Sequence, residues 1–122
     1  MSIYSEAVLE HFRNPRNTGE LPGATAQVEG TNPVCGDVLR LFAVVEQGRI
    51  REARFLCRGC TTAIACASWL TENLRGKTPD EAKEVDASAI SRALGGLPPA
   101  TAHGAQLAVD TLKELLAQIK ST

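Results

Sequence analysis

Residues 37–75, DVLRLFAVVEQGRIREARFLCRGCTTAIACASWLTENLR, decide the fold of this chain. Residues 37–45 carry apolar side chains on both faces of an expected strand, and residues 49–56 follow as a second strand. The short loop 46–48 between them is typical of a hairpin, so the two strands are expected to be antiparallel. Gly59 then marks a sharp turn into a helix over 61–75.

The sequence makes specific predictions for two of the helices. Thr61 or Thr62 is expected to cap the helix that follows Gly59, because a hydroxyl can accept a free N–H at a helix start. An N-terminal helix is expected over 3–12, with Phe12 on its apolar stripe and His11 at the surface or its boundary without a role.

The rest of the chain completes a segregated order of elements. We expect a strand over 25–30 and helices from Thr78, over 87–94 and over 103–119. One helix, then three strands, then several helices indicates an α+β fold rather than alternating α/β. A length of 122 residues fits one domain, which we expect to span residues 1–122.

Composition and charge exclude several function classes. The chain has 13 basic and 14 acidic residues, so its net charge of −1 attracts neither nucleic acid nor an anionic membrane. The N-terminus lacks the pattern of a signal peptide, and no apolar run approaches the roughly 20 residues that cross a bilayer. We expect a cytoplasmic protein, where four cysteines indicate metal ligands, reactive thiols or core residues before disulfides.

The cysteines form the candidate site. In Cys35-Gly36-Asp37, a thiol and a carboxylate flank a glycine that lets the backbone bend, although a turn with an incidental cysteine is the alternative. Cys60 precedes a helix, whose free N–H groups and dipole stabilise a thiolate, so it is the best ligand or nucleophile. Cys57 is either buried beside Phe55 or functional, and Cys66 is expected to pack in the core.

His103 adds a nitrogen donor at the start of the last helix. A neutral imidazole can ligate a metal, although such a residue is also commonly solvated. Together Cys35, Asp37, Cys60 and His103 offer two sulfurs, one nitrogen and one oxygen. Zinc accepts such a mixed set, whereas iron–sulfur clusters usually take more thiolate. Spacing alone therefore indicates a metal site without naming the metal.

Five motifs in order resemble the IscU / NifU N-terminal scaffold family, over about residues 3–118. They are Asn14-Pro15-Arg16-Asn17, Cys35-Gly36-Asp37, the strand-turn-helix around Gly59-Cys60, Gly76-Lys77-Thr78 followed by Asp80-Glu81-Ala82, and Leu97-Pro98-Pro99. The resemblance implies a three-stranded antiparallel sheet packed against several helices. It also implies that Leu97, Pro98 and Pro99 begin a segment that an Hsp70-type chaperone recognises.

The same resemblance implies a function. Members of the family assemble a [2Fe–2S] cluster transiently, take sulfur from a cysteine desulfurase and pass the cluster to apo-proteins, and their site can hold zinc instead of iron. By position, Cys35, Asp37 and Cys60 match family ligands, and His103 matches the histidine beside the third ligand cysteine. A scaffold of this kind is a carrier rather than an enzyme.

Two positions depart from the family. Gly104 stands where the family has its third cysteine, which binds the cluster and is thought to accept the sulfur. Ala100-Thr101 stand where the family's chaperone segment continues with valine and lysine. Our hypothesis is that Cys57 supplies the missing thiolate. The alternative functions are a zinc-binding sulfur relay, with Cys60 or Cys57 as nucleophile, and a regulatory partner of a desulfurase that holds no cluster.

Overall fold

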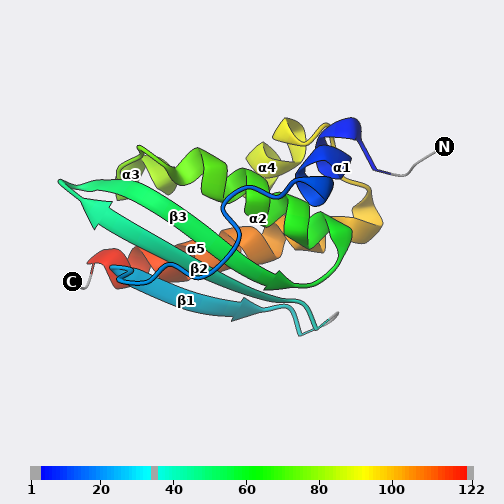
Figure 1. The fold of residues 1–122 in the computed structure, drawn as a ribbon. Helices are drawn as coiled ribbons and strands as arrows, with labels where there is room; N and C mark the ends of the chain where they lie inside the picture. Colours follow the sequence, from blue (N-terminus) through cyan, green and yellow to red (C-terminus); the bar gives the residue numbers. More distant parts are fainter. Residues whose placement is uncertain (1–3, 34–35, 121–122) are drawn as a thin grey trace.

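A computed structural model describes residues 4–33 and 36–120 of the chain. In chain order the elements are α1 (Glu6–Arg13), β1 (Ala26–Thr31), β2 (Val38–Glu46), β3 (Arg49–Arg58), α2 (Thr61–Leu74), α3 (Pro79–Ala82), α4 (Ala87–Ala93), the 3-10 helix η1 (Pro99–Thr101) and α5 (His103–Lys120). The fold is α+β, and its three antiparallel strands lie in the order β1-β2-β3 (Figure 1). The expected fold class is confirmed.

The hairpin between β2 and β3 is tighter than the sequence predicts. Only Gln47 and Gly48 separate the strands, with φ angles of 53° and 76°. Two consecutive left-handed residues make a turn whose twist matches that of the flanking strands. The register places Leu39 opposite Cys57, and side chains that are directly opposite share a face of the sheet.

Helices α2 and α5 lie together against one face of the sheet (Figure 1). Leu39, Leu41 and Phe55 project from that face, are at most 2% exposed, and belong to one core cluster with side chains of both helices. The start of α2 follows the end of β3, and the start of α5 reaches the same end of the sheet. In the described ranges, no helix combines the length and apolar character needed to cross a membrane.

The connection over residues 14–25 lies along the edge and outer face of the sheet. Gly19 donates its N–H to the Phe55 carbonyl at 2.9 Å, which adds the segment to the free edge of β3. On the outer face, the Arg40 guanidinium lies 5.1 Å from the centroid of the Phe42 ring. The Arg40 guanidinium over the ring helps to explain why Phe42 is buried although its side chain points away from the helices.

Two expectations for α1 are wrong. Phe12 is 40% exposed, whereas His11 is buried and its Nδ1 lies 2.8 Å from Ser68 Oγ on α2. The cause is that α1 packs on α2 through Val8 and His11, three positions apart, so that Phe12 is turned toward solvent. Ser68 Oγ also accepts the Arg16 N–H at 2.9 Å, so one hydroxyl on α2 contacts both His11 of α1 and the backbone that follows α1.

Candidate metal centre

Asp37 stands where the β1–β2 loop enters β2. Its carbonyl accepts the Asn32 N–H at 2.9 Å, and Gly36 before it has a φ of 75°, a left-handed conformation at the glycine where the sequence predicts a bend. The Asp37 side chain is 7% exposed, and its Oδ2 has no hydrogen-bond partner among the described residues. A buried carboxylate oxygen without a donor is unfavourable in apolar surroundings, so this oxygen fits a cation.

Gly59 determines how close the Asp37 carboxylate comes to the next element. A Cβ atom at position 59 would lie 2.9 Å from Asp37 Cγ, a distance that real Cβ atoms do not adopt. The carboxylate therefore lies directly on the backbone that precedes Cys60. The sequence predicts only a turn at Gly59, because Asp37, the residue that lies against it, belongs to a distant segment of the chain.

Cys60 is the N-cap of α2, which corrects the expectation that Thr61 or Thr62 caps this helix. Burial raises the pKa of the Cys60 thiol above its ordinary value, and the Asp37 carboxylate raises it further. The backbone N–H groups of Ala63 and Thr62, at the helix start, act in the opposite direction. A cation that contacts this sulfur would favour its thiolate.

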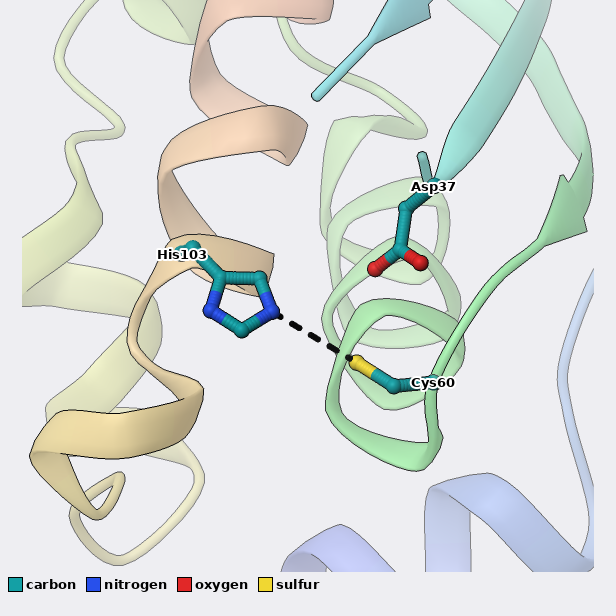
Figure 2. Close-up of side chains that lie close together, drawn as sticks. All are labelled: Asp37, Cys60 and His103. Atoms are coloured by element: carbon teal, nitrogen blue, oxygen red, sulfur yellow. Dashed lines mark hydrogen bonds between the residues drawn. The ribbon is translucent and has the colours of Figure 1, made fainter. Parts of the chain in front are cut away.

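His103 opens α5 and faces Cys60 from the opposite side. Its Nε2 lies 4.0 Å from Cys60 Sγ, and the ring is half-buried (Figure 2). One donor atom each of Asp37, Cys60 and His103 lies within 4.8 Å of the other two. Three segments that are distant in the chain thus bring an oxygen, a sulfur and a nitrogen to one point. These are three of the four donors that the sequence predicts for one site.

This donor set suits a transition-metal ion. Zinc and iron both accept thiolate, imidazole and carboxylate ligands. The unpartnered Oδ2 of Asp37 supports the same interpretation, because a bound cation would satisfy it. Cys35, the fourth residue of the predicted set, lies outside the described residues.

Cys57 lies near this group without belonging to it. Its side chain points from β3 to the helix-covered face, opposite Leu39, and packs against the core cluster. Desolvation by burial raises the pKa of its thiol to about 12, and the nearby Asp37 and Cys60 add to the effect. Among the described residues, the group whose donor atoms meet consists of Asp37, Cys60 and His103.

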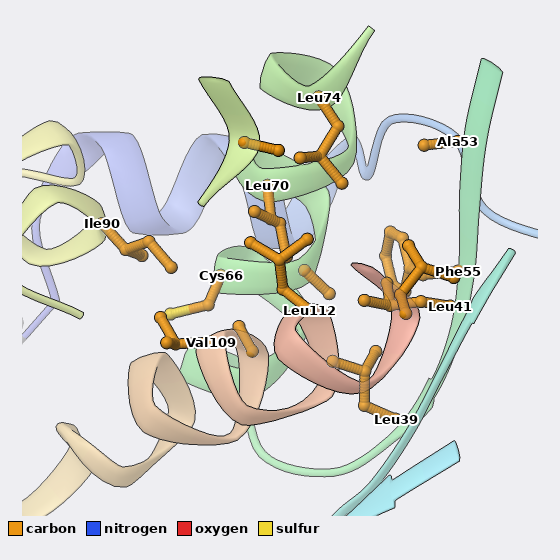
Figure 3. Packing of buried hydrophobic residues seen from close by; sticks show 14 of the residues in the cluster. Leu39, Leu41, Ala53, Phe55, Cys66, Leu70, Leu74, Ile90, Val109 and Leu112 are labelled. Atoms are coloured by element: carbon orange, nitrogen blue, oxygen red, sulfur yellow. The ribbon is translucent and has the colours of Figure 1, made fainter. Parts of the chain in front are cut away.

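Cys66 is a core residue. It is 0% exposed, and its sulfur lies among Leu70, Ile90 and Val109 in the packed interior (Figure 3). Burial raises the pKa of its thiol to about 12. The prediction that Cys66 serves packing is confirmed.

Gly104 is buried where α5 meets the start of α2. A Cβ atom there would lie 3.0 Å from the Ala63 nitrogen and 3.0 Å from Thr62 Cγ2, tighter than ordinary van der Waals contact. The starts of α2 and α5 therefore come close together at position 104, where the family resemblance predicts a cysteine. Thr62 is fully buried, and its hydroxyl has no hydrogen-bond partner among the described residues. The absence of a third ligand thiol at this position stays a prediction from the sequence, whereas the close approach of the two helices is not predictable from it.

Leu97, Pro98 and Pro99 lie just before α5. Leu97 packs against the core cluster, whereas Pro99 is exposed and opens η1, which leads into His103. The segment is thus partly accessible beside the metal centre, and chaperone recognition there stays a prediction.

Comparison with known proteins gives consistent matches. The family model described as NifU-like N terminal domain matches residues 3–121. The chain is 40% identical over 114 residues to iron-sulfur cluster assembly scaffold protein IscU 1 of Archaeoglobus fulgidus, covering 93% of this chain and 74% of that protein. It is also 40% identical over 122 residues to iron-sulfur cluster assembly scaffold protein IscU of Escherichia coli K12, covering 97% and 94%.

Solved structures agree with the fold. The N-terminal part of a NifU-like protein from Brucella abortus superposes with a TM-score of 0.80 at 21% identity, covering 98% of this chain and 96% of that one. A putative scaffold protein for the SUF system from Fervidobacterium islandicum gives a TM-score of 0.76 at 23% identity, covering 93% and 96%. At these identities the structures support the architecture alone.

Proposed function

This chain belongs to the NifU-like N-terminal domain family, and on that premise we propose that it is a scaffold on which a [2Fe–2S] cluster is assembled and then passed to apo-proteins. In this role the protein carries its cargo and turns over no substrate. The relatives at 40% identity, named as iron–sulfur cluster assembly scaffolds, support this assignment along nearly the whole chain.

One observation carries the proposal. The donor atoms of Asp37, Cys60 and His103 lie within 4.8 Å of one another, and the buried Asp37 Oδ2 has no hydrogen-bond partner among the described residues. Buried polar atoms without a partner are rare in folded proteins, and a bound metal ion would satisfy this oxygen. The half-buried Cys60 and His103 leave the site accessible enough for a cargo to enter and leave.

We assign iron binding to Cys35, Asp37, Cys60 and His103. Thiolates bind iron strongly, and a carboxylate is a harder and weaker partner, so Asp37 would keep one bond easy to exchange. Zinc fits the same four donors and is the alternative occupant. The sulfur would come from a cysteine desulfurase, and an Hsp70-type chaperone would bind the segment over residues 97–99.

Cys57 as a replacement for the missing third thiolate stays a separate prediction. If Cys57 binds the cargo, Cys57→Ser should abolish retention of iron or zinc. Unchanged metal content in that variant would exclude this role and leave the four-residue set.

The function is tested by assembly and transfer. The protein is incubated anaerobically with ferrous iron, cysteine and a cysteine desulfurase, then separated and mixed with an apo-ferredoxin. We expect thiolate-to-iron absorbance in the visible range, followed by holo-ferredoxin formation that a chelator in the mixture does not block. A colourless protein that retains zinc and transfers nothing would instead support the sulfur-relay or regulatory function.

A further inference from the structure

We propose that the outer edge of β1 is a docking surface for an extended, basic segment of a partner protein, which adds to the sheet as a further strand. This surface lies outside the metal centre, so the proposal goes beyond the scaffold function and holds with or without a bound metal. Three features meet there: open backbone groups, a groove against α5 and carboxylates without an ion pair.

β1 is the open edge of the sheet. The strand order β1-β2-β3 leaves one side of β1 and one side of β3 without a neighbouring strand (Figure 1). The connection over residues 14–25 covers β3, where Gly19 bonds the Phe55 carbonyl. Among the residues that the structure describes, β2 alone pairs with β1. An open edge strand can pair with another chain.

The backbone of this edge offers hydrogen-bonding groups at alternate residues. Gln27 donates its N–H away from β2, to Gln118 Oε1 of α5 at 2.7 Å. N–H groups alternate between the two sides of a paired strand, so those of Glu29 and Thr31 point the same way as that of Gln27. In the described part of the chain, neither of these two N–H groups has a partner. An added strand would bond both.

Helix α5 forms the floor of a groove beside this edge. A hollow of about 290 Å³ is lined by residues 29–31 and by Leu107, Asp110, Thr111 and Glu114 of α5. A Cβ atom at Gly30 would collide with Thr111 Oγ1, so the helix lies directly against the strand. A second hollow of about 170 Å³ shares Thr31, Leu107 and Asp110 with the first and reaches His103. A segment bound in this groove would therefore lie beside the candidate metal centre.

The groove is acidic. Glu29, Asp110 and Glu114 line the larger hollow, and no lysine or arginine does. In the described ranges, none of these three carboxylates forms an ion pair. Arg40 lies opposite Glu29 on β2, but its guanidinium lies 3.8 Å from the Glu20 carboxylate instead.

The charge of the groove selects the occupant. Alternate side chains of an extended segment face the same side, so lysine or arginine at alternate positions would meet the carboxylates together. A second copy of this chain fits poorly, because pairing β1 with β1 would bring two acidic grooves against each other. The groove therefore suits a basic segment of a different protein that pairs by strand addition.

The test uses the full chain without metal and a short peptide of alternating lysine and valine. A second peptide carries glutamate in place of lysine. Amide hydrogen exchange followed by NMR reports on the N–H groups of Glu29 and Thr31. We expect the lysine peptide to slow the exchange of both groups and to bind more weakly as salt is added, because the charges are exposed. The glutamate peptide should leave both exchange rates unchanged.

Variants separate the charge from the strand pairing. Asp110→Asn combined with Glu114→Gln should weaken binding of the lysine peptide by about 10-fold, measured by fluorescence anisotropy of the labelled peptide. Glu6→Gln combined with Glu84→Gln is the matched control, because it removes the same charge from exposed positions outside the groove and should bind like the wild type.

Glu29→Pro removes one outward N–H, and an edge strand tolerates proline where the nitrogen faces solvent. It should bind the lysine peptide more weakly than Glu29→Gln, which loses the same charge but keeps the N–H. If Glu29→Pro does not fold, the exchange rates of the wild type decide the question.

Several results would overturn the proposal. They are failure of the lysine peptide to bind, equal binding of both peptides, and binding that leaves the exchange of Glu29 and Thr31 unchanged. Protection of these two groups that grows with protein concentration, without peptide, would show that a second copy occupies the edge. None of these results bears on the scaffold function, because peptide binding involves neither iron nor sulfide.

Discussion

Gly59 has no side-chain chemistry, yet the position of the Asp37 carboxylate depends on it. A Cβ atom at position 59 would lie 2.9 Å from Asp37 Cγ, so the carboxylate occupies space that a side chain there would need. A side chain at this position would displace the Asp37 carboxylate, which we propose as the oxygen ligand. Gly59 would then affect metal binding only through the position of Asp37.

We therefore predict that Gly59→Ala weakens metal binding by about 10- to 100-fold, the usual effect of disturbing a group that orients a ligand. Titration with Co²⁺, followed by its visible absorption, measures the affinity. Gly48→Asn is the control, because Gly48 has open space around its Cβ position and asparagine tolerates its φ of 76°. Equal Co²⁺ affinity in Gly59→Ala and the wild type would show that Asp37 does not contact the metal.

At the level of elements, the contact between α5 and α2 is built around the absence of a side chain at Gly104. We predict that Gly104→Cys destabilises the protein by about 1–3 kcal/mol, the cost of overpacking a well-filled contact. Urea unfolding measures the change. Gln106→Cys, exposed on the same helix, should stay within about 0.5 kcal/mol of the wild type. A Gly104→Cys protein as stable as the wild type would mean that the helices separate freely.

The contact between α1 and α2 should make stability depend on pH. Burial lowers the pKa of His11 below 6.5 and the charge of Arg16 lowers it further, while Glu72 and Glu10 act in the opposite direction. Below about pH 6.5 the unfolded chain binds a proton that the folded chain resists, so this group reduces folding stability as pH falls. A protonated His11 can only donate through Nδ1, so its contact with Ser68 Oγ at 2.8 Å must then have the serine oxygen as acceptor.

Urea unfolding at about pH 7.5 and about pH 5 tests this effect of the His11 imidazole. The unfolding free energy should fall less between the two pH values for His11→Gln than for the wild type. The remaining acid-sensitive groups are the same in both proteins, so the difference belongs to His11. Parallel pH profiles would contradict the account.

Local patterns predicted the elements well, and contacts between elements explain what they missed. The strands, α2 and α5 follow from apolar spacing within each segment. The buried His11 contacts Ser68, 57 residues away, and the sequence around His11 does not predict this contact. The cap of α2 was misplaced because the helix begins at Thr61, one residue after Cys60.

At the scale of the whole molecule, the candidate metal centre forms where three separate segments meet at one end of the sheet. The end of β3, the start of β2 and the start of α5 converge there. The sequence grouped Asp37, Cys60 and His103 as donors of one metal site, and the family resemblance matched Asp37 and Cys60 to known ligands. The closing of α2 onto α5 at Gly104 could not be foreseen, since both helices had to be placed first.

The most direct test of the central claim is the content of iron and acid-labile sulfide after anaerobic reconstitution with iron and sulfide. The account predicts equal amounts of both in the wild type and in Cys66→Ser, and loss of both in Cys60→Ser. A wild-type protein that holds neither, or a Cys60→Ser variant that keeps its full content of both, would contradict the assignment of this centre as the cluster site.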